Sequence, residues 1–209
     1  NNSDRAIWAE GEKTFDNVSI SFNGGDAILG DGDMTFNGVI LSENNGYGIY
    51  GDGDMYFTNV SINDNSSFGM NSAGYKNFET VSVSDNGTYG IRGDGNMNFE
   101  DVTILNNGGS GIDGDGTIIY NNVQIENNNT FGINSEGGKT FENVSILGNG
   151  AYGLRGDGNM FFNIVTINEN EAYGIDGDGD AFFTNVFIDS NNSFGMNSSG
   201  SKTFNNVSI

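Results

Sequence analysis

Apolar and polar residues alternate along this chain in short runs that recur every 21 residues. Beginning at Ala6, the units start at residues 6, 27, 48, 69, 90, 111, 132, 153, 174 and 195, with no insertion or deletion between them. The third unit, GIYGDGDMYFTNVSINDNSSF, shows apolar positions two apart in its Gly-Ile, Met-x-Phe and Val-x-Ile runs. A period of two predicts β-strands, and the density of Gly and Asn disfavours helices.

Several positions of the unit, numbered here as places 1 to 21, hold one residue type throughout. Place 13 is Val in every unit, place 10 is Phe except for Tyr120, and place 6 is always Gly. Strict register with three short strands per unit predicts an all-β fold, a single-stranded parallel β-helix (β-solenoid) of about ten coils. Residues 1–209 are expected to form one such solenoid without capping units. Equivalent side chains would then stack in columns ~4.8 Å apart.

Two invariant places have a predicted structural role. The Gly at place 6 is expected to supply a positive φ at the corner written GDG in most coils. The Asn at place 18 is predicted to turn inward and bond to the next coil, forming a ladder along the axis; a left-handed turn residue is the simpler alternative. The ladder residues are Asn23, Asn44, Asn65, Asn86, Asn107, Asn128, Asn149, Asn170 and Asn191.

The stretches VSINDNSSFGM and VTINENEAYGI carry a resemblance to a known family. They resemble the right-handed parallel β-helix (pectin-lyase-like) repeat, and also the Asn and Gly-Ile repeats of bacterial surface adhesins and autotransporter passengers. The resemblance covers essentially the whole chain and implies a right-handed solenoid. It leaves the function open, because this superfamily includes lyases, phage tailspikes, adhesins and structural fibres.

The basic residues lie on the same lattice. Lys13, Lys76, Lys139 and Lys202 occupy place 8 at intervals of 63 residues, which indicates that the gene segment grew three coils at a time. We expect each stem to pack on the flanking Met column while the ammonium reaches the acidic corners as a counter-ion. At place 3, the column predicts two exposed cross-coil ion pairs, Arg92 with Asp113 and Arg155 with Asp176.

The acidic corners are the candidate metal ligands. Oxygen-rich loops bent at Gly suit Ca²⁺, but a solvated turn explains the same residues, so we predict no firm metal site and no cofactor other than possible calcium. The candidates are Asp31, Asp33, Asp52, Asp54, Asp94, Asp115, Asp157, Asp178 and Asp180.

Composition restricts the partners and the chemistry. A net charge of −21 argues against nucleic acid and anionic membranes as partners, and no apolar run is long enough for membrane insertion. Polysaccharide-cleaving β-helices, which this repeat resembles, cluster carboxylates with Arg or Lys where loops interrupt the repeat. Here no complete unit departs from 21 residues and there is no His or Cys. The sequence therefore predicts no catalytic residues and no enzyme.

The function predicted from the sequence is a structural or adhesive extracellular fibre segment, secreted or at the cell surface. Copies would stack end to end, or the segment would belong to a longer solenoid, with glycans or a host or cell surface as possible partners. The alternative is a carbohydrate-binding or polysaccharide-degrading β-helix protein. Catalytic clusters in flanking sequence, or glycan binding by this segment, would favour the alternative.

Overall fold

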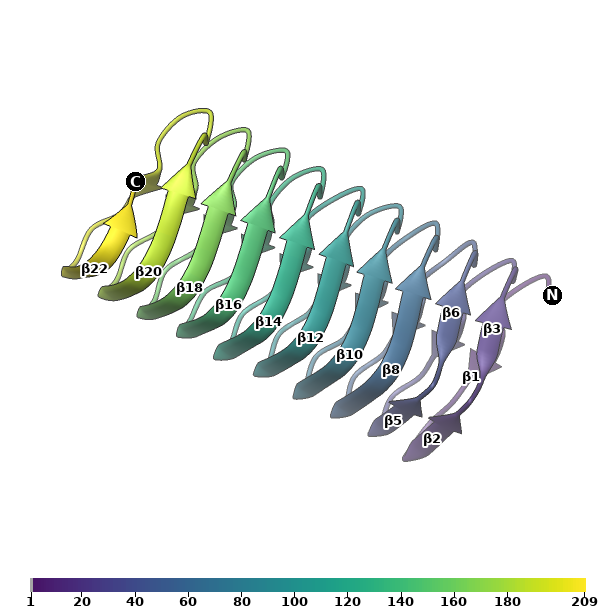
Figure 1. Ribbon diagram of the computed structural model, residues 1–209. Coiled ribbons are helices and arrows are strands. Elements are labelled where there is room, and N and C mark those ends of the chain that lie inside the picture. Colours follow the sequence, from purple (N-terminus) through teal and green to yellow (C-terminus); the bar gives the residue numbers. More distant parts are fainter. Residues whose placement is uncertain (1) are drawn as a thin grey trace.

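The computed structural model describes residues 2–209 as a stack of parallel coils, with the two ends of the chain at opposite ends of the stack (Figure 1). Every strand pairs in parallel with residues 21 positions away, as in Phe57 with Phe78 and Val60 with Val81. The predicted all-β parallel solenoid and its register are confirmed. No helix long and apolar enough to cross a membrane is found in residues 2–209.

The strands form two sheets that run the length of the stack. The first sheet consists of two-residue strands: β1 (Ile7–Trp8), β4 (Ile28–Leu29), β7 (Ile49–Tyr50), β9 (Met70–Asn71), β11 (Ile91–Arg92), β13 (Ile112–Asp113), β15 (Ile133–Asn134), β17 (Leu154–Arg155), β19 (Ile175–Asp176) and β21 (Met196–Asn197). The second, longer sheet consists of β2 (Lys13–Asp16), β3 (Ser19–Ser21), β5 (Met34–Asn37), β6 (Ile40–Ser42), β8 (Met55–Asn63), β10 (Lys76–Ser84), β12 (Met97–Leu105), β14 (Ile118–Glu126), β16 (Lys139–Leu147), β18 (Met160–Asn168), β20 (Ala181–Asp189) and β22 (Lys202–Ser208).

The number of strands per coil differs from the prediction beyond the second coil. The first two coils contain three strands each, but from β8 onward the second and third predicted strands are one continuous strand. The chain still turns at place 12, where Asn59, for example, has a φ of 55°. One left-handed residue bends the strand without interrupting the hydrogen bonds on either side, so the two runs remain in one ladder.

The core is built from the stacked columns. The Val column is buried from Val39 to Val186, and the rings at place 10 stack face to face, as Phe57 and Phe78 do with centroids 4.8 Å apart. The Gly at place 6 has a positive φ in every coil. At Gly53 a Cβ atom would lie 2.4 Å from the carbonyl oxygen of Gly32, so the coil spacing itself requires glycine there.

The asparagines at place 18 form an unbroken chain of side-chain hydrogen bonds. The Asn65 Oδ1 atom accepts from Nδ2 of Asn44 at 2.9 Å and from its backbone N–H at 3.3 Å. The Asn65 Nδ2 group donates to Oδ1 of Asn86 at 3.1 Å and to the backbone carbonyl of Leu41 at 3.1 Å. The amide thus makes four hydrogen bonds in the core, which offsets the cost of burying it.

Candidate functional site

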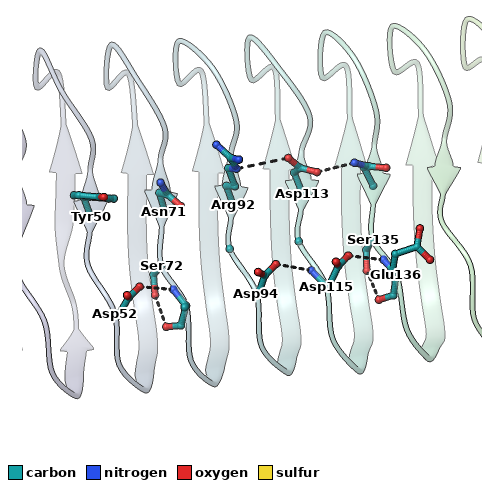
Figure 2. Close-up of a pocket in the computed structure, with 14 residues that line it drawn as sticks. Tyr50, Asp52, Asn71, Ser72, Arg92, Asp94, Asp113, Asp115, Ser135 and Glu136 are labelled. Atoms are coloured by element: carbon teal, nitrogen blue, oxygen red, sulfur yellow. Dashed lines mark hydrogen bonds and ion pairs between the residues drawn. The ribbon is translucent and has the colours of Figure 1, made fainter.

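A groove runs along the axis beside the first sheet, between the outward side chains of places 3 and 5. Its middle section has a volume of about 600 Å³ and lies over five coils (Figure 2). Tyr50 and Asp52 also line a hollow toward the N-terminus that begins at Trp8, and Glu136 also lines one that continues to Asn197. These three adjoining hollows make one surface feature, called the axial groove below.

The groove arises from the repeat itself. In each two-residue strand the first side chain enters the core and the second points outward, as Ile91 and Arg92 do. The GDG corner that follows places a second outward side chain, such as Asp94, beside the first. Two side-chain rows therefore recur in every coil, and the residue between them is Gly in six of the ten coils.

The middle of the groove has an ordered polar network. The Nε atom of Arg92 lies 3.8 Å from Oδ2 of Asp113, and Nδ2 of Asn134 donates to Oδ1 of Asp113 at 2.7 Å (Figure 2). The guanidinium of Arg92 also lies over the rings of Phe68 and Tyr89, 5.7 Å from each centroid. The predicted neighbours Arg92 and Asp113 are therefore in place, and two aromatic rings that we did not predict support the guanidinium.

The second predicted pair differs. No ion pair joins Arg155 to Asp176 in the part of the chain that the structure describes. Asp176 accepts a hydrogen bond from Nδ2 of Asn197 at 2.7 Å, while the guanidinium of Arg155 lies over Phe131, 5.5 Å from the ring centroid, and near Tyr152. The prediction of an Arg155–Asp176 ion pair was therefore wrong.

The candidate calcium ligands have a role in holding the coils together. Each accepts a backbone N–H from the following coil: Oδ1 of Asp52 from Ala73 at 2.9 Å and Oδ1 of Asp94 from Asp115 at 3.1 Å. Bonds from the hydroxyl and the backbone of Ser199 lower the pKa of Asp178. No group of three or more acidic side chains suited to one metal ion occurs within residues 2–209. Calcium binding remains a prediction.

Two of the lysines are buried more deeply than the prediction of an ammonium reaching the acidic corners implied. Lys76 and Lys139 are fully buried, and the ammonium of Lys76 donates to the carbonyl oxygens of Gly74 and Asp94, both at 2.9 Å. Burial lowers the pKa of Lys76 to about 8, although the charges of Asp94, Asp52 and Asp54 act in the opposite direction. The carboxylates thus favour the ammonium form from a distance, and carbonyl oxygens hold it.

The other lysines bind carbonyl oxygens in the same manner, although Lys13 and Lys202, unlike Lys139, are only partly buried. Lys139 donates to Gly137 and Asp157 at 2.9 and 3.1 Å, and Lys202 donates to Gly179 at 2.7 Å. Lys13 donates to the carbonyl oxygens of Glu10 and Glu12. The four lysines therefore close glycine corners, and none of them lines the axial groove.

The groove presents charged and polar groups that can bind a ligand. Its middle section carries five carboxylates and one guanidinium. Asp94 and Asp115 lie on successive coils, ~4.8 Å apart by the coil spacing, and each keeps one oxygen that is not engaged by a backbone N–H.

The chain belongs to the right-handed β-helix family. Residues 5–154 match the family model described as a right handed beta helix region. The handedness implied by the resemblance in the sequence is thus confirmed. No curated protein matches the chain by sequence.

Solved structures with a similar fold include two alginate-modifying enzymes. A double mutant of the periplasmic alginate epimerase AlgG matches with a TM-score of 0.67 at 14% identity, covering 97% of this chain and 70% of that one. The A-module of the mannuronan C-5 epimerase AlgE6 from Azotobacter vinelandii matches with a TM-score of 0.58 at 13% identity, covering 97% and 75%. At this identity the likeness shows a shared fold.

These matches correct one prediction. We predicted no enzyme because the coils are regular and lack His, but solved β-helices with a similar fold are epimerases. The exclusion of an enzyme was therefore wrong.

Proposed function

We propose that this chain is a polysaccharide-active β-helix protein that binds an extended glycan along the axial groove. The observation that carries the proposal is the continuity of the groove from Trp8 to Asn197, with a new pair of outward side chains in each coil. Amide, carboxylate, guanidinium and aromatic groups in rows are the partners that sugar hydroxyls and sugar faces require. The polysaccharide-modifying neighbours support this reading over the fibre.

We also propose that the protein acts outside the cytoplasm. A polysaccharide ligand and a periplasmic structural neighbour support a site of action outside the cytoplasm. That copies of the chain stack end to end stays a prediction, since it concerns the ends of the stack and the groove concerns its side.

Two tyrosines of one coil allow a matched test. Tyr50 lines the groove and Tyr56 lies on the outer face of β8, and both side chains are 43% exposed. Calorimetric titration with linear neutral and acidic polysaccharides should show binding that Tyr50→Ala weakens about tenfold, because a stacking face of the order of 1 kcal/mol is lost. Tyr56→Ala should bind as the wild type does.

Product analysis completes the test. NMR spectra of each bound polysaccharide after prolonged incubation would reveal new reducing ends, unsaturated sugars or inverted ring carbons. Replacing Asp115 by Asn should abolish any such product if the stacked carboxylates act in catalysis. Absence of binding to every polysaccharide, or equal losses from Tyr50→Ala and Tyr56→Ala, would contradict the proposed function.

A further inference from the structure

The axial groove contains the same polar set twice. Residues 69–131 and 132–194 are consecutive copies of the three-coil unit, and the outward residues Asn71, Arg92 and Asp113 of the first recur as Asn134, Arg155 and Asp176 in the second. Other outward positions have changed between the copies. At place 9, on the outer face of the second sheet, the first copy has Asn77, Asn98 and Ile119 and the second has Thr140, Phe161 and Phe182. Common origin therefore does not by itself keep outward residues identical.

Both arginines are held in one orientation. Arg92 lies over a Phe and a Tyr from the preceding turns, at 5.7 Å from each, and Arg155 lies over a Phe and a Tyr at 5.5 and 5.9 Å. Stacking on aromatic faces orients a guanidinium without using its N–H groups. Within residues 2–209, neither arginine donates a hydrogen bond from its terminal nitrogens, and only Nε of Arg92 approaches a carboxylate. Each groove arginine therefore presents a preoriented pair of donors.

The two arginines are three coils apart, which is ~14 Å at the coil spacing of a parallel sheet. An extended β-linked glycan advances by about one coil spacing for each sugar, so the arginines would meet every third sugar. A planar guanidinium with unused donors binds carboxylate or sulfate oxygens in a fork. A ligand that binds both arginines therefore needs anionic groups ~14 Å apart, on every third sugar.

The surrounding charge restricts how many anionic groups the ligand can carry. Around Arg92 the groove contains Asp52, Asp94, Asp113, Asp115 and Glu136, and the whole chain has a net charge of −21. A glycan with an acid on every sugar would place most of its charges beside these carboxylates, and the repulsion would oppose binding. A glycan with anionic groups only opposite the arginines avoids this repulsion.

We propose that Arg92 and Arg155 form two equivalent oxyanion subsites that recognise a carboxylate or sulfate on every third sugar of an otherwise neutral glycan. The proposal rests on the proposed function, since it requires a glycan in the axial groove. It distinguishes this groove from one suited to a uniformly acidic polymer.

Nonasaccharides of one neutral backbone test the proposal directly on the wild-type chain. Five ligands are compared by calorimetry: unsubstituted, carboxylated on every third sugar, sulfated on every third sugar, carboxylated on every second sugar, and carboxylated on every sugar. We expect at least one of the ligands substituted on every third sugar to bind roughly tenfold or more tighter than the unsubstituted one, since a charged hydrogen bond contributes that much. The carboxylate and sulfate arms identify the anion.

Arginine variants then assign the effect. Arg92→Gln and Arg155→Gln should each reduce the advantage of the preferred ligand severalfold, and the double variant should bind it no better than the unsubstituted ligand. Arg5→Gln, which removes the third arginine of the chain outside the groove, should change nothing. Added salt should reduce the advantage in the wild type.

The outcomes separate the two proposals. Equal binding of the unsubstituted and the substituted ligands, or tighter binding of the ligands carboxylated on every second sugar or on every sugar, overturns the subsite proposal and leaves a glycan-binding groove. Failure of all five ligands, together with failure of every polysaccharide in the Tyr50 experiment, overturns both.

Discussion

Replacing Lys76 by Met should stabilise the chain at neutral pH. Lys76 pairs with Met55 and Met97 on the neighbouring coils, so the substitution completes a column of methionines. In those neighbouring coils the corner glycine donates its N–H to the next coil, from Gly53 to Ala73 at 3.2 Å and from Gly95 to Asp115 at 2.8 Å. In the coil of Lys76 the ammonium instead donates hydrogen bonds to the carbonyl oxygens of Gly74 and Asp94.

The magnitude follows from the cost of burying the charge. The pKa of Lys76 is lowered from 10.5 to about 8, which corresponds to about 3 kcal/mol against the ammonium form in the folded state. Losing the two bonds of the amine costs roughly 1 kcal/mol, and a re-formed backbone bond in the corner offsets part of that. We therefore expect Lys76→Met to raise the free energy of unfolding by about 2 kcal/mol at pH 7.

The advantage should disappear as the pH rises. Because the folded-state pKa of Lys76 lies below the unfolded value, the unfolded chain binds more protons between pH 8 and 10.5. Wild-type stability therefore rises with pH in this window, by up to about 1.4 kcal/mol per pH unit for each buried lysine. The variant has one such lysine fewer, so its stability rises less steeply.

Urea unfolding followed by circular dichroism at pH 7 and pH 9.5 measures both effects. Met97→Lys serves as the reverse control, since it introduces a buried ammonium into a methionine coil and should destabilise the chain at pH 7. The reasoning is refuted if Lys76→Met is less stable than the wild type at pH 7, or if its advantage is the same at both pH values.

Four further predictions concern the core, the bends and the corners. Asn107→Asp should cost about 3 kcal/mol or more, because the ladder loses the Nδ2 donor to Asn128 and gains a buried charge, whereas Asn106→Asp at the exposed neighbouring position should change the urea midpoint little. Tyr120→Phe should stabilise by about 1 kcal/mol, since the buried hydroxyl has no partner within residues 2–209, and Phe99→Tyr should do the reverse in thermal melts. Ile164→Asn should raise the melting temperature, because a β-branched residue is held at a φ of 54° while its side chain stays half exposed. Saturating Ca²⁺ should raise the melting temperature if the corner aspartates bind it, and an unchanged melting temperature in calcium and in chelator would reject that binding.

The repeat was sufficient to predict the fold because each structural requirement recurs in the sequence. The Val at place 13 and the Asn at place 18 never change, so their neighbours on adjacent coils follow from counting. The joined strand from β8 onward could not be predicted, because place 12, which is Asn in six of the ten units, looks like a strand end whether or not the ladder continues through it. The φ of 55° at Asn59 is compatible with a strand end and with a bend inside one strand.

The site was harder to predict than the fold. Counting placed Arg92 beside Asp113, but the direction of a side chain depends on what lies on either side of its coil. The rings of Phe68 and Tyr89 come from residues at the end of the preceding units, and their contact with Arg92 decides where the guanidinium lies. The burial of Lys76 was missed for a similar reason, because only the structure shows carbonyl groups turned inward at its corner.

The asparagine ladder gives the stack a direction. In every step the Nδ2 group of one coil points to the Oδ1 atom of the coil that follows it, from Asn2 through to Asn191. Aligned amide dipoles polarise one another, so each rung is strengthened by those before and after it. A break in the middle would weaken the hydrogen bonds on both sides of it. Each of two half-length stacks would then have less than half the free energy of unfolding of the full stack. The longer the uninterrupted row, the more rigid its axis should be.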